Sequence, residues 1–443
     1  MASNSNASSG SNTALTPLPE SDRQFGWREH AALWLSLGVG LLVIQIGAYL
    51  VPALGAPSAL LVIVCGSVLG AGLLAWTAKV GCDSGLSSAG LMHATYGSSF
   101  AKLPVLLNIV QLVGWTAFEL VIMRDGTIAI ARQTGGFASD LWPILATLLW
   151  GGAVLALMAG SMVTLVRKFI GRYGLPLVML SLLWLSWQFL AKASTLGFSA
   201  LWNKPGDDSM SLLAALDLVI AMPVSWLPLV ADFARHGREG KGALRGTWVG
   251  YAIANIWCYG LGVLVAITTP STELVTALLV AQGGLIALGL ILIDEVDNAY
   301  GDVYSGSVAG HSLLPAWNVR RWGMLLAAGC TALALVLPMH SLEPFLLMLS
   351  SVFVPLYGVI LARLGAAADV AALVSDRRVN GSAVAIWLLG IVCYHLCAQF
   401  APDWGAALPS LALSFGLAWA TRSHPTTGHA VSREPISLNH TKK

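Results

Sequence analysis

Twelve apolar runs of roughly the length that crosses a bilayer constrain the fold of this chain more than any other feature. A membrane-spanning helix needs about 20 consecutive apolar residues. Only 10% of the 443 residues are charged, whereas a soluble protein carries about 25%. We therefore predict an all-α integral membrane protein with twelve transmembrane helices. The predicted spans are Ala31–Leu50, Ser58–Val80, Leu103–Met123, Leu141–Val163, Gly174–Phe189, Leu212–Val230, Thr247–Thr268, Thr276–Asp294 with a polar continuation to Ser305, Gly323–Leu337, Leu342–Leu364, Ala383–Gln399 and Ala406–Ala420.

Lysine and arginine are distributed unequally between the two sides that twelve spans define. An even number of spans puts both termini on one side of the membrane. Of the 24 Lys and Arg residues, only Arg124, Arg132, Lys192 and Lys204 fall on the opposite side. Basic residues collect on the cytoplasmic side, so we predict cytoplasmic termini in a cell inner or plasma membrane. We expect a disordered cytoplasmic tail at 1–24, one transporter domain at 25–421 and a cytoplasmic tail at 422–443.

The first and sixth spans both contain residues that interrupt a helix. Glycine weakens a helix and bares its backbone, and proline removes a backbone donor and kinks the helix. These residues are Gly38, Gly40 and Gly47 in the first span and Pro223 and Pro228 in the sixth. Interruptions at corresponding positions of two halves are typical of the midplane site of an inverted-repeat transporter. Close helix packing is the alternative explanation for the glycines.

Polar side chains form a stripe along the third span, LLNIVQLVGWTAFELV. Asn108, Gln111, Trp115 and Glu119 share one helix face by their spacing. An indole can stack on a planar ring while amide and carboxyl groups bond to the edge of that ring. A carboxyl group within a span is costly and usually functional, so we favour a ligand-binding face. Hydrogen bonding between helices, with Trp115 as packing, is the alternative.

The densest acidic cluster of the chain lies in the eighth span, in the stretch LILIDEVDNAYGDVYS. Four carboxyl groups this close cannot all ionise at low cost, so we expect at least one to hold a proton. On a helix, Asp294 and Asp297 share one face, while Glu295, Asn298 and Asp302 form a neighbouring stripe. The cluster predicts a proton carrier or a counter-ion to a cation. The alternative is that the span ends early and its last carboxylates lie in water.

No other pattern indicates catalysis or a metal centre. The sequence lacks the GxSxG, HExxH and P-loop motifs, so we do not expect an enzyme. Cys393 and Cys397 flank His395 at helical spacing, which is more typical of helix packing than of a metal site. No basic patch with interleaved aromatics indicates a nucleic-acid partner. We expect a monomer in the lipid bilayer with no cofactor, a coupling ion that is H⁺ or Na⁺, and no metal beyond Na⁺.

Five stretches in their order and spacing resemble the nucleobase–cation symporter family, the purine–cytosine permeases. They are PLPESDRQFGW before the first span, SGLSS after the second, LLNIVQLVGW in the third, SWLPLVADFAR in the sixth and FLLMLSSVFVPLYGVILA in the tenth. The pattern is nearest to the hydroxymethylpyrimidine/cytosine transporter subgroup. The resemblance implies the LeuT-type fold, with two inverted five-helix repeats plus two extra helices. It also implies transport of nitrogen heterocycles with Na⁺ or H⁺.

The resemblance assigns roles to individual residues. Trp115 matches the family's stacking tryptophan, Glu119 falls where an amide often binds the ring, and Gln45 matches a polar contact of the first span. Carbonyl groups near Leu41 and Ile44 match half of the family's cation site. The full predicted set comprises Gln45, Gln111, Trp115, Glu119, Trp226, Asp294 and Asn298 for substrate, Leu41, Ile44, Asp294, Glu295 and Asp297 for the cation, and Pro223, Pro228 and Asp232 as gate or structural residues.

The eighth span departs from the family pattern. Family members bring a pair of hydroxyl groups for Na⁺ there, where this chain has Asp294 and Glu295. Carboxyl groups bind protons readily, so we favour H⁺ as the coupling ion. We interpret the protein as a secondary active importer of a planar nitrogen heterocycle by alternating access. An amino acid or amine transporter of the same fold and a membrane sensor that binds without transport are the alternatives.

Overall fold

The computed structural model is all-helical and describes residues 13–135, 141–160, 173–269, 274–336, 342–367, 369–374 and 377–422. Residues 1–12 of the predicted tail at 1–24 and residues 423–443 of the predicted tail at 422–443 lie outside these residues, as do Arg167, Lys168 and Arg172, which contribute to the charge bias. The 3-10 helices are η1 (Glu20–Asp22), η3 (Ala371–Leu373) and η4 (Pro402–Trp404). The α-helices are α1 (Trp27–Ser36), α2 (Leu41–Leu54), α3 (Ala56–Ser84), α4 (Ser88–Tyr96), α5 (Lys102–Gln133), α6 (Trp142–Met158), α8 (Leu175–Leu196), α9 (Phe198–Trp202), α10 (Leu212–Ser225), α11 (Leu227–Ala234), α12 (Gly240–Thr268), α13 (Leu274–Val280), α14 (Gly284–Leu313), α15 (Val319–Val336), α16 (Leu342–Leu364), α17 (Gly381–Phe400) and α18 (Ala407–Ala420).

The helices of the described residues account for the twelve predicted spans. Eight segments are long and apolar enough to cross a membrane, with α10 and α11 counted as one, and the bent pair α1 and α2 makes a ninth. The shorter apolar helices α6 and α18 coincide with the fourth and twelfth predicted spans. The remaining span is α14, whose 30 residues carry the acidic cluster in the middle.

The start of the eighth span was predicted wrongly. The apolar run from Thr276 does not form one helix, because α13 ends at Val280 and α14 begins only at Gly284. Gly283 between them has a φ of 71°, a left-handed conformation that glycine adopts without a Cβ clash. At its other end α14 continues past Ser305 to Leu313, and Asp302 is only 3% exposed. The alternative of an early end in water is therefore wrong.

The first span is broken, as the glycines predict. Residues 37–40 separate α1 from α2, and the two helix axes meet at 63°. Two glycines near this break also lie close to α12. Gly38 packs where a Cβ would lie 2.7 Å from the Ala254 Cβ, and a Cβ on Gly47 would lie 2.2 Å from the Tyr259 carbonyl oxygen. Both explanations therefore hold, since the backbone unwinds at the break while Gly38 and Gly47 allow α12 to approach closely.

The sixth span is interrupted more gently, at Trp226 between α10 and α11. The Leu229 amide bonds to the Trp226 carbonyl at 3.2 Å instead of reaching back to Ser225, so the Ser225 carbonyl has no helical partner. Pro223 has no N–H, and the carbonyl it would bond, that of Val219, instead accepts from the Tyr259 hydroxyl at 3.3 Å. Side chains of other helices thus replace backbone bonds that this span lacks.

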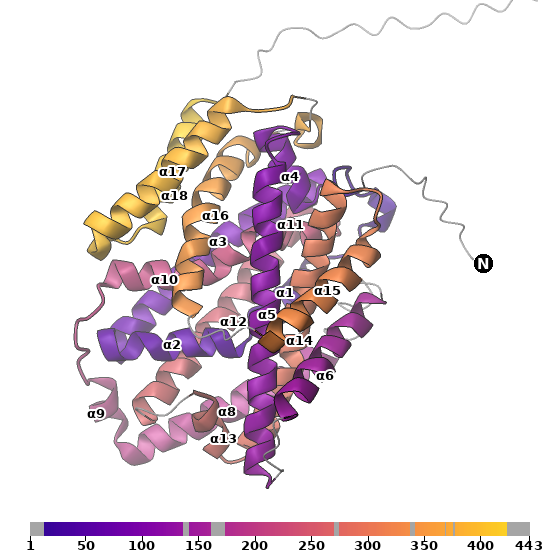
Figure 1. Cartoon of the computed structure of the whole chain (residues 1–443). Helices are drawn as coiled ribbons and strands as arrows, with labels where there is room; N and C mark the ends of the chain where they lie inside the picture. The colour runs from indigo at the N-terminus through magenta and orange to yellow at the C-terminus, as the bar shows by residue number, and fades with distance from the viewer. Residues whose placement is uncertain are drawn as a thin grey trace, which may run out of the picture.

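The broken spans lie at the centre of the bundle. Helices α1 and α2 both pack on α12, α10 packs on α3, and the long helices α5 and α14 pack against each other. Figure 1 shows α5 running the full height of the molecule, with α17 and α18 together at one side. The core that these helices enclose contains both breaks, so any site built from the breaks is inside the protein.

Replacing Gly47 with alanine tests the close approach of α2 to α12. The added Cβ would overlap the Tyr259 backbone, and overpacking of this kind lowers the free energy of unfolding by about 1–3 kcal/mol. Gly260 on α12 is the matched control, because a Cβ there meets nothing within 4 Å. Thermal unfolding of the purified variants should show a lower midpoint for Gly47→Ala and an unchanged or higher one for Gly260→Ala. Equal midpoints would contradict the packing.

Candidate substrate and ion site

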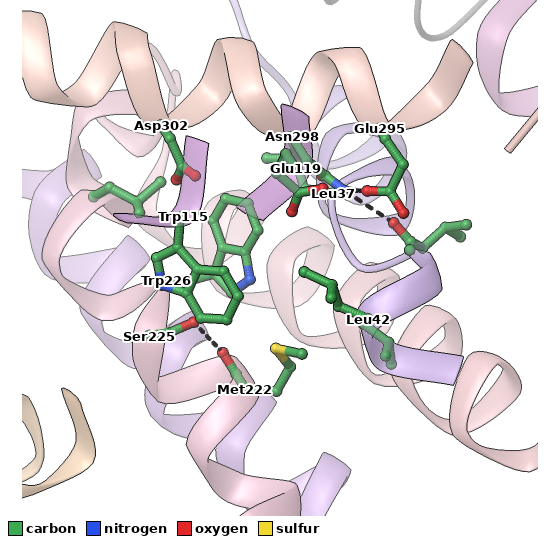
Figure 2. A pocket seen from close by; sticks show the side chains of 14 residues that line it. Leu37, Leu42, Trp115, Glu119, Met222, Ser225, Trp226, Glu295, Asn298 and Asp302 are labelled. Atoms are coloured by element: carbon green, nitrogen blue, oxygen red, sulfur yellow. Dashed lines mark hydrogen bonds between the residues drawn. The ribbon is translucent and has the colours of Figure 1, made fainter. Parts of the chain in front are cut away.

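A cavity lies where the breaks of the first and sixth spans face α5 and α14. Its atom-free space is about 400 Å³, of which only about 20 Å³ is open to the centre of a water molecule. Figure 2 shows the acidic and amide side chains of α14 reaching into it from one side, opposite the segment around Met222 and Ser225. Its lining residues are Leu37, Val39, Gly40, Leu42, Val43, Trp115, Glu119, Met222, Ser225, Trp226, Leu229, Glu295, Asn298 and Asp302.

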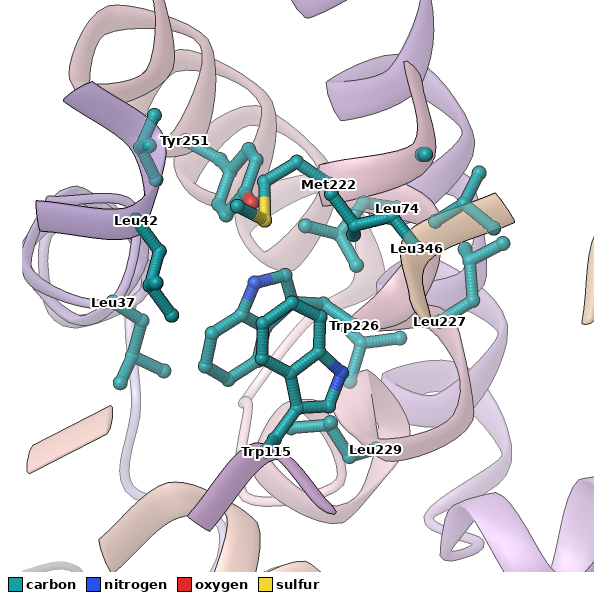
Figure 3. Packing of buried hydrophobic residues seen from close by; sticks show 14 of the residues in the cluster. Leu37, Leu42, Leu74, Trp115, Met222, Trp226, Leu227, Leu229, Tyr251 and Leu346 are labelled. Atoms are coloured by element: carbon teal, nitrogen blue, oxygen red, sulfur yellow. The ribbon is translucent and has the colours of Figure 1, made fainter. Parts of the chain in front are cut away.

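Two indoles form the aromatic part of the cavity. Trp115 comes from α5 and Trp226 from the interruption of the sixth span, and they are 6% and 9% exposed. Each is held by an edge-on aromatic neighbour, Phe345 at 5.1 Å from Trp115 and Trp34 at 5.8 Å from Trp226, measured between ring centroids. Figure 3 shows both indoles surrounded by apolar side chains such as Leu37, Leu42 and Met222. The cavity therefore offers rigid flat surfaces within an apolar wall.

Glu295 and Asn298 join α14 to the break of the first span. The Leu41 amide, at the start of α2, donates to Glu295 Oε1 at 2.5 Å. The Asn298 amide nitrogen donates to the Val39 carbonyl and to Glu295 Oε2, both at 3.1 Å. A carboxylate at the N-terminus of a helix also interacts favourably with the helix dipole. These bonds satisfy two of the backbone groups that unwinding sets free, the Leu41 amide and the Val39 carbonyl.

Glu119 meets Glu295 across the cavity. Both carboxyl groups line the cavity, and Glu119 is 5% exposed. Glu295 accepts from the Leu41 amide and from the Asn298 amide nitrogen. The Oε2 atom of Glu119 is buried and has no hydrogen-bond partner in the described residues. Glu119 thus presents a free acceptor to the cavity.

Asp302 lies one helical turn beyond Asn298 on the same face of α14. It lines the cavity and is 3% exposed. The ion pairs Lys79–Asp83 and Arg124–Asp125 lie elsewhere, and no ion pair to a carboxyl group of α14 is formed among the described residues. The stripe of Glu295, Asn298 and Asp302 that the sequence indicates therefore faces the cavity as one surface.

A second acidic group lies at the end of α1 and does not line the cavity. The Ser36 hydroxyl is 2.8 Å from Asp297 Oδ2 and 3.2 Å from Asp294 Oδ1. Asp294 is 4% exposed and its Oδ2 has no partner in the described residues. Asp294 and Asp297 are therefore brought together on the face of α14 that turns toward α1. Ser36 itself was missed, although its position just before the glycines of the break is a signal for it.

Three predicted site residues of the first span do not line this cavity. Gln45 is exposed and is not among the residues that line the cavity. Leu41 and Ile44 belong to α2, so their carbonyl groups fall within the helical hydrogen-bonding pattern rather than being free. The group that Leu41 offers is its amide, which Glu295 accepts. Among the carbonyl groups freed by the break, that of Val39, two residues earlier, accepts from Asn298.

The polar stripe of the third span divides into two parts. Asn108 donates to the Pro228 carbonyl at 2.9 Å, and Gln111 donates to the free Ser225 carbonyl at 3.3 Å. Neither amide lines the cavity. The alternative of interhelical bonding thus describes Asn108 and Gln111, while Trp115 and Glu119, further along the same stripe, do face the cavity.

The predicted gate residues lie around the sixth span without lining the cavity. Pro223 is inside α10 and Pro228 is in the first turn of α11. Asp232 on α11 is buried, accepts from the Ser88 amide at 2.9 Å and is also bonded by the Ser305 hydroxyl. Asp232 therefore ties α11 to the start of α4 and to α14, as a structural residue would.

Comparison with solved structures shows which fold this is. The fold resembles that of Mhp1, a nucleobase-cation-symport-1 family transporter, in a closed conformation with bromovinylhydantoin bound, with a TM-score of 0.79 and 14% identity over 93% of this chain and 94% of that chain. The inward-facing conformation of Mhp1 gives a TM-score of 0.75 and 16% identity, covering 94% of each chain. A substrate-bound outward-open Na⁺-coupled sialic acid symporter gives 0.61 and 10%, covering 94% and 91%. The predicted LeuT-type fold is confirmed.

The family follows from the sequence itself. Residues 17–421 match the model of a family described as permeases for cytosine/purines, uracil, thiamine and allantoin. The chain belongs to this permease family, which confirms the predicted nucleobase–cation symporter membership, and it is a multi-pass membrane protein and a secondary transporter. A comparison with curated proteins finds no match.

The position of Gln45 gives a prediction at variance with the resemblance. Gln45→Ala should change the affinity for a nucleobase ligand by less than about twofold, because the side chain is exposed and makes no cavity contact. Asn298→Ala should lower that affinity at least about tenfold, because a lost cavity amide also leaves the Val39 carbonyl unpaired. Calorimetric titration of purified protein measures both. A large loss with Gln45→Ala would restore the role that the resemblance implies.

Proposed function

We propose that the protein imports a planar nitrogen heterocycle, a pyrimidine or a related nucleobase or vitamin precursor, by alternating access and coupled to H⁺. The observation that carries the proposal is the pairing of Trp115 and Trp226 in one enclosed cavity with carboxyl and amide groups beside them. A flat ring can stack on an indole while its edge nitrogens bond to Glu119 and Asn298. The family match and the predicted subgroup agree with this substrate class.

The geometry around Ser36 favours a proton as the coupling ion. A hydroxyl group has one hydrogen, so Ser36 can donate fully to only one of its two carboxyl neighbours, Asp294 and Asp297. The second contact becomes a full hydrogen bond when one of these carboxyl groups carries a proton. Because Ser36 ends α1 and the aspartates belong to α14, this proton would hold the bundle helices together in one conformation. Release of the proton would then favour another conformation.

The proposed arrangement in the membrane follows from the charge bias. Both termini lie in the cytoplasm, with one transporter domain at 25–421 between two tails, in the cell inner or plasma membrane. The heterocycle and the proton enter from outside and leave toward the cytoplasm. No cofactor or enzymatic step is part of this cycle.

Uptake by proteoliposomes tests transport against its alternatives. Labelled cytosine and 4-amino-5-hydroxymethylpyrimidine should accumulate under an inward proton gradient. Binding without accumulation under either an H⁺ or a Na⁺ gradient would indicate a sensor. Uptake of amino acids or amines in place of heterocycles would indicate a transporter of the same fold with another substrate.

Trp115→Ala should abolish detectable heterocycle binding, while Trp115→Phe should retain a part of it. Base–aromatic stacking contributes about 1–3 kcal/mol, and alanine also opens the apolar wall of the cavity. Fluorescence or calorimetric titration with cytosine measures the affinity, and thermal unfolding shows whether each variant is folded. Unchanged affinity in a folded Trp115→Ala protein would refute the stacking arrangement.

Asp294→Asn should uncouple uptake from the proton gradient. Asparagine keeps a hydrogen bond to Ser36 but cannot gain or lose a proton, so concentrative uptake should fall to equilibration while exchange of internal for external heterocycle continues. Asp125→Asn, an exposed change on α5, is the matched control and should leave coupling intact. Retained proton-driven accumulation in Asp294→Asn would move the coupling role to Asp297 or Glu119.

A further inference from the structure

Arg235, at the end of α11, is a buried positive charge without a partner. It is 8% exposed, and its Nε and Nη1 atoms are buried and make no hydrogen bond with the described residues. The ion pairs formed among these residues, Lys79–Asp83 and Arg124–Asp125, do not involve it. A guanidinium group keeps its proton in proteins, so its charge persists when it is buried. Because an unpaired buried charge is costly, a conformation in which Arg235 gains an anionic partner would be stabilised by that pair.

Asp232 is the one acidic residue of α11 and lies one turn before Arg235. Residues three apart on a helix are close enough to pair, yet in this structure the carboxylate bonds to other helices. It is 1% exposed. Its Oδ1 accepts from the Ser88 amide at 2.9 Å, in the first turn of α4, where the helix dipole also favours an anion. Its Oδ2 accepts from the Ser305 hydroxyl of α14. Both oxygens of Asp232 are therefore occupied, and neither is paired with Arg235.

The two hydrogen bonds of Asp232 join helices that belong to different groups. Helix α11 packs on α3, which in turn packs on α10 and α12. Helix α14 packs on α5 and α15, and α4 contacts both α14 and α16. Figure 1 shows α4 and α11 at the same end of the molecule. In an alternating-access cycle one group of helices moves against the other around the site, so the bonds of Asp232 cross the boundary at which movement is expected.

This boundary is closed on the side of the N-terminal segment, which is the inner side of the proposed arrangement. Trp34 is fully buried between the cavity indole of Trp226, at 5.8 Å, and Phe233 of α11, at 6.3 Å, measured between ring centroids. Phe233 in turn packs on Tyr304 of α14 at 5.4 Å. Phe25 of the N-terminal segment pairs with the chain just beyond α11. Release toward this side therefore requires α11 and α14 to separate, which also breaks the bond between Asp232 and α14.

We propose that Asp232 exchanges partners during the transport cycle. It bonds to Ser88 and Ser305 while the inner side is closed, and it pairs with Arg235 when α11 and α14 separate. Without the exchange, opening would leave two opposite charges of one helix unpaired, which is strongly unfavourable. Arg235 thus stabilises the inner-open conformation selectively, because only that conformation contains the pair. The inference rests on the alternating-access part of the proposed function and on no particular substrate or coupling ion.

The distance between two spin labels on the purified full-length protein tests the exchange. The labels are attached to cysteines that replace two exposed residues, Lys241 at the start of α12 and Ala316 after α14. The exposed or half-buried native cysteines Cys65, Cys393 and Cys397 are changed to serine. Electron paramagnetic resonance should resolve a shorter distance for the closed inner side and a longer one for the open inner side. The ratio of the two populations gives the open fraction.

Two substitutions should move the open fraction in opposite directions. Ser305→Ala removes a hydrogen bond that only the closed conformation contains, so the open fraction should rise at least about threefold. Arg235→Gln removes the pair that only the open conformation contains, so the open fraction should fall by about three- to fivefold. Arg235→Lys keeps the charge and should retain most of the open fraction. Arg238→Gln, an exposed change in the same loop, is the matched control and should leave the open fraction unchanged.

A double variant shows whether Asp232 is the partner of Arg235. In an Asp232→Asn protein the pair no longer exists, so Arg235→Gln should change the open fraction by less than about twofold. Glu239→Gln is the matched control, because it changes an exposed acid of the same loop to an amide and should leave the effect of Arg235→Gln intact. The comparison is also made in the Ser305→Ala protein, in which the open fraction is raised and a fall is readily measured.

Thermal unfolding shows which variants are folded, and the outcomes separate the inference from the proposed function. An unchanged open fraction in Arg235→Gln or in Ser305→Ala would overturn the partner exchange while alternating access remains. An effect of Arg235→Gln that is equally large in Asp232→Asn would do the same. If Asp232→Asn does not fold, the opposite shifts of the two single variants decide. A single distance in the parent protein and in every variant would contradict alternating access and the inference together.

Discussion

Backbone groups freed at a helix break inside a bilayer must be satisfied by the protein, since an unpaired group there costs several kcal/mol. This requirement determines where the two longest helices lie. At the first break, Glu295 and Asn298 of α14 bond to Leu41 and Val39. At the second, Gln111 of α5 bonds to the freed carbonyl of the sixth span. Helices α5 and α14 are thereby fixed beside both breaks, and the cavity is the space between them.

The groups that face the cavity lie within one or two turns of the groups that satisfy the breaks. On α5, Trp115 and Glu119 follow Gln111 by one and two turns, and on α14, Asp302 follows Asn298 by one turn. On each helix, one turn of the face therefore bonds to the backbone of a broken span, and the next turn lines the cavity. Because Glu295 bonds to the Leu41 amide and also lines the cavity, a change at the break of the first span reaches the cavity through one carboxyl group.

The number of membrane spans could be predicted because it depends on the length and composition of apolar runs. The direction of single side chains and the start of the eighth span depend on helical phase or on a local turn, and these could not be predicted. Twelve apolar runs are a strong signal because the bilayer sets their length. The direction of Gln45 was not predictable, because the unwound stretch at 37–40 resets the phase of every later residue in the span. The polar stripe of the third span divides between residues that bond to the sixth span and residues that line the cavity. This division depends on which backbone carbonyls of the sixth span lack a helical partner, which the sequence does not reveal. The start of the eighth span was missed because Gly283 turns the chain inside an otherwise continuous apolar run.

The acidic cluster divides into two sets with different surroundings, which no count of carboxylates along the sequence reveals. Successive residues of a helix diverge by about 100°, so Asp294 and Glu295, although adjacent, face different partners. Asp294 joins Asp297 and the end of α1 at Ser36, whereas Glu295 joins the start of α2. One helix therefore contacts the two halves of the broken span through separate carboxyl groups. In a proton-coupled cycle, protonation of Asp294 or Asp297 would alter how Ser36 and α1 are held, while the side chains that line the cavity would keep their contacts. Ion binding and substrate recognition would then involve different side chains of the same helix, α14.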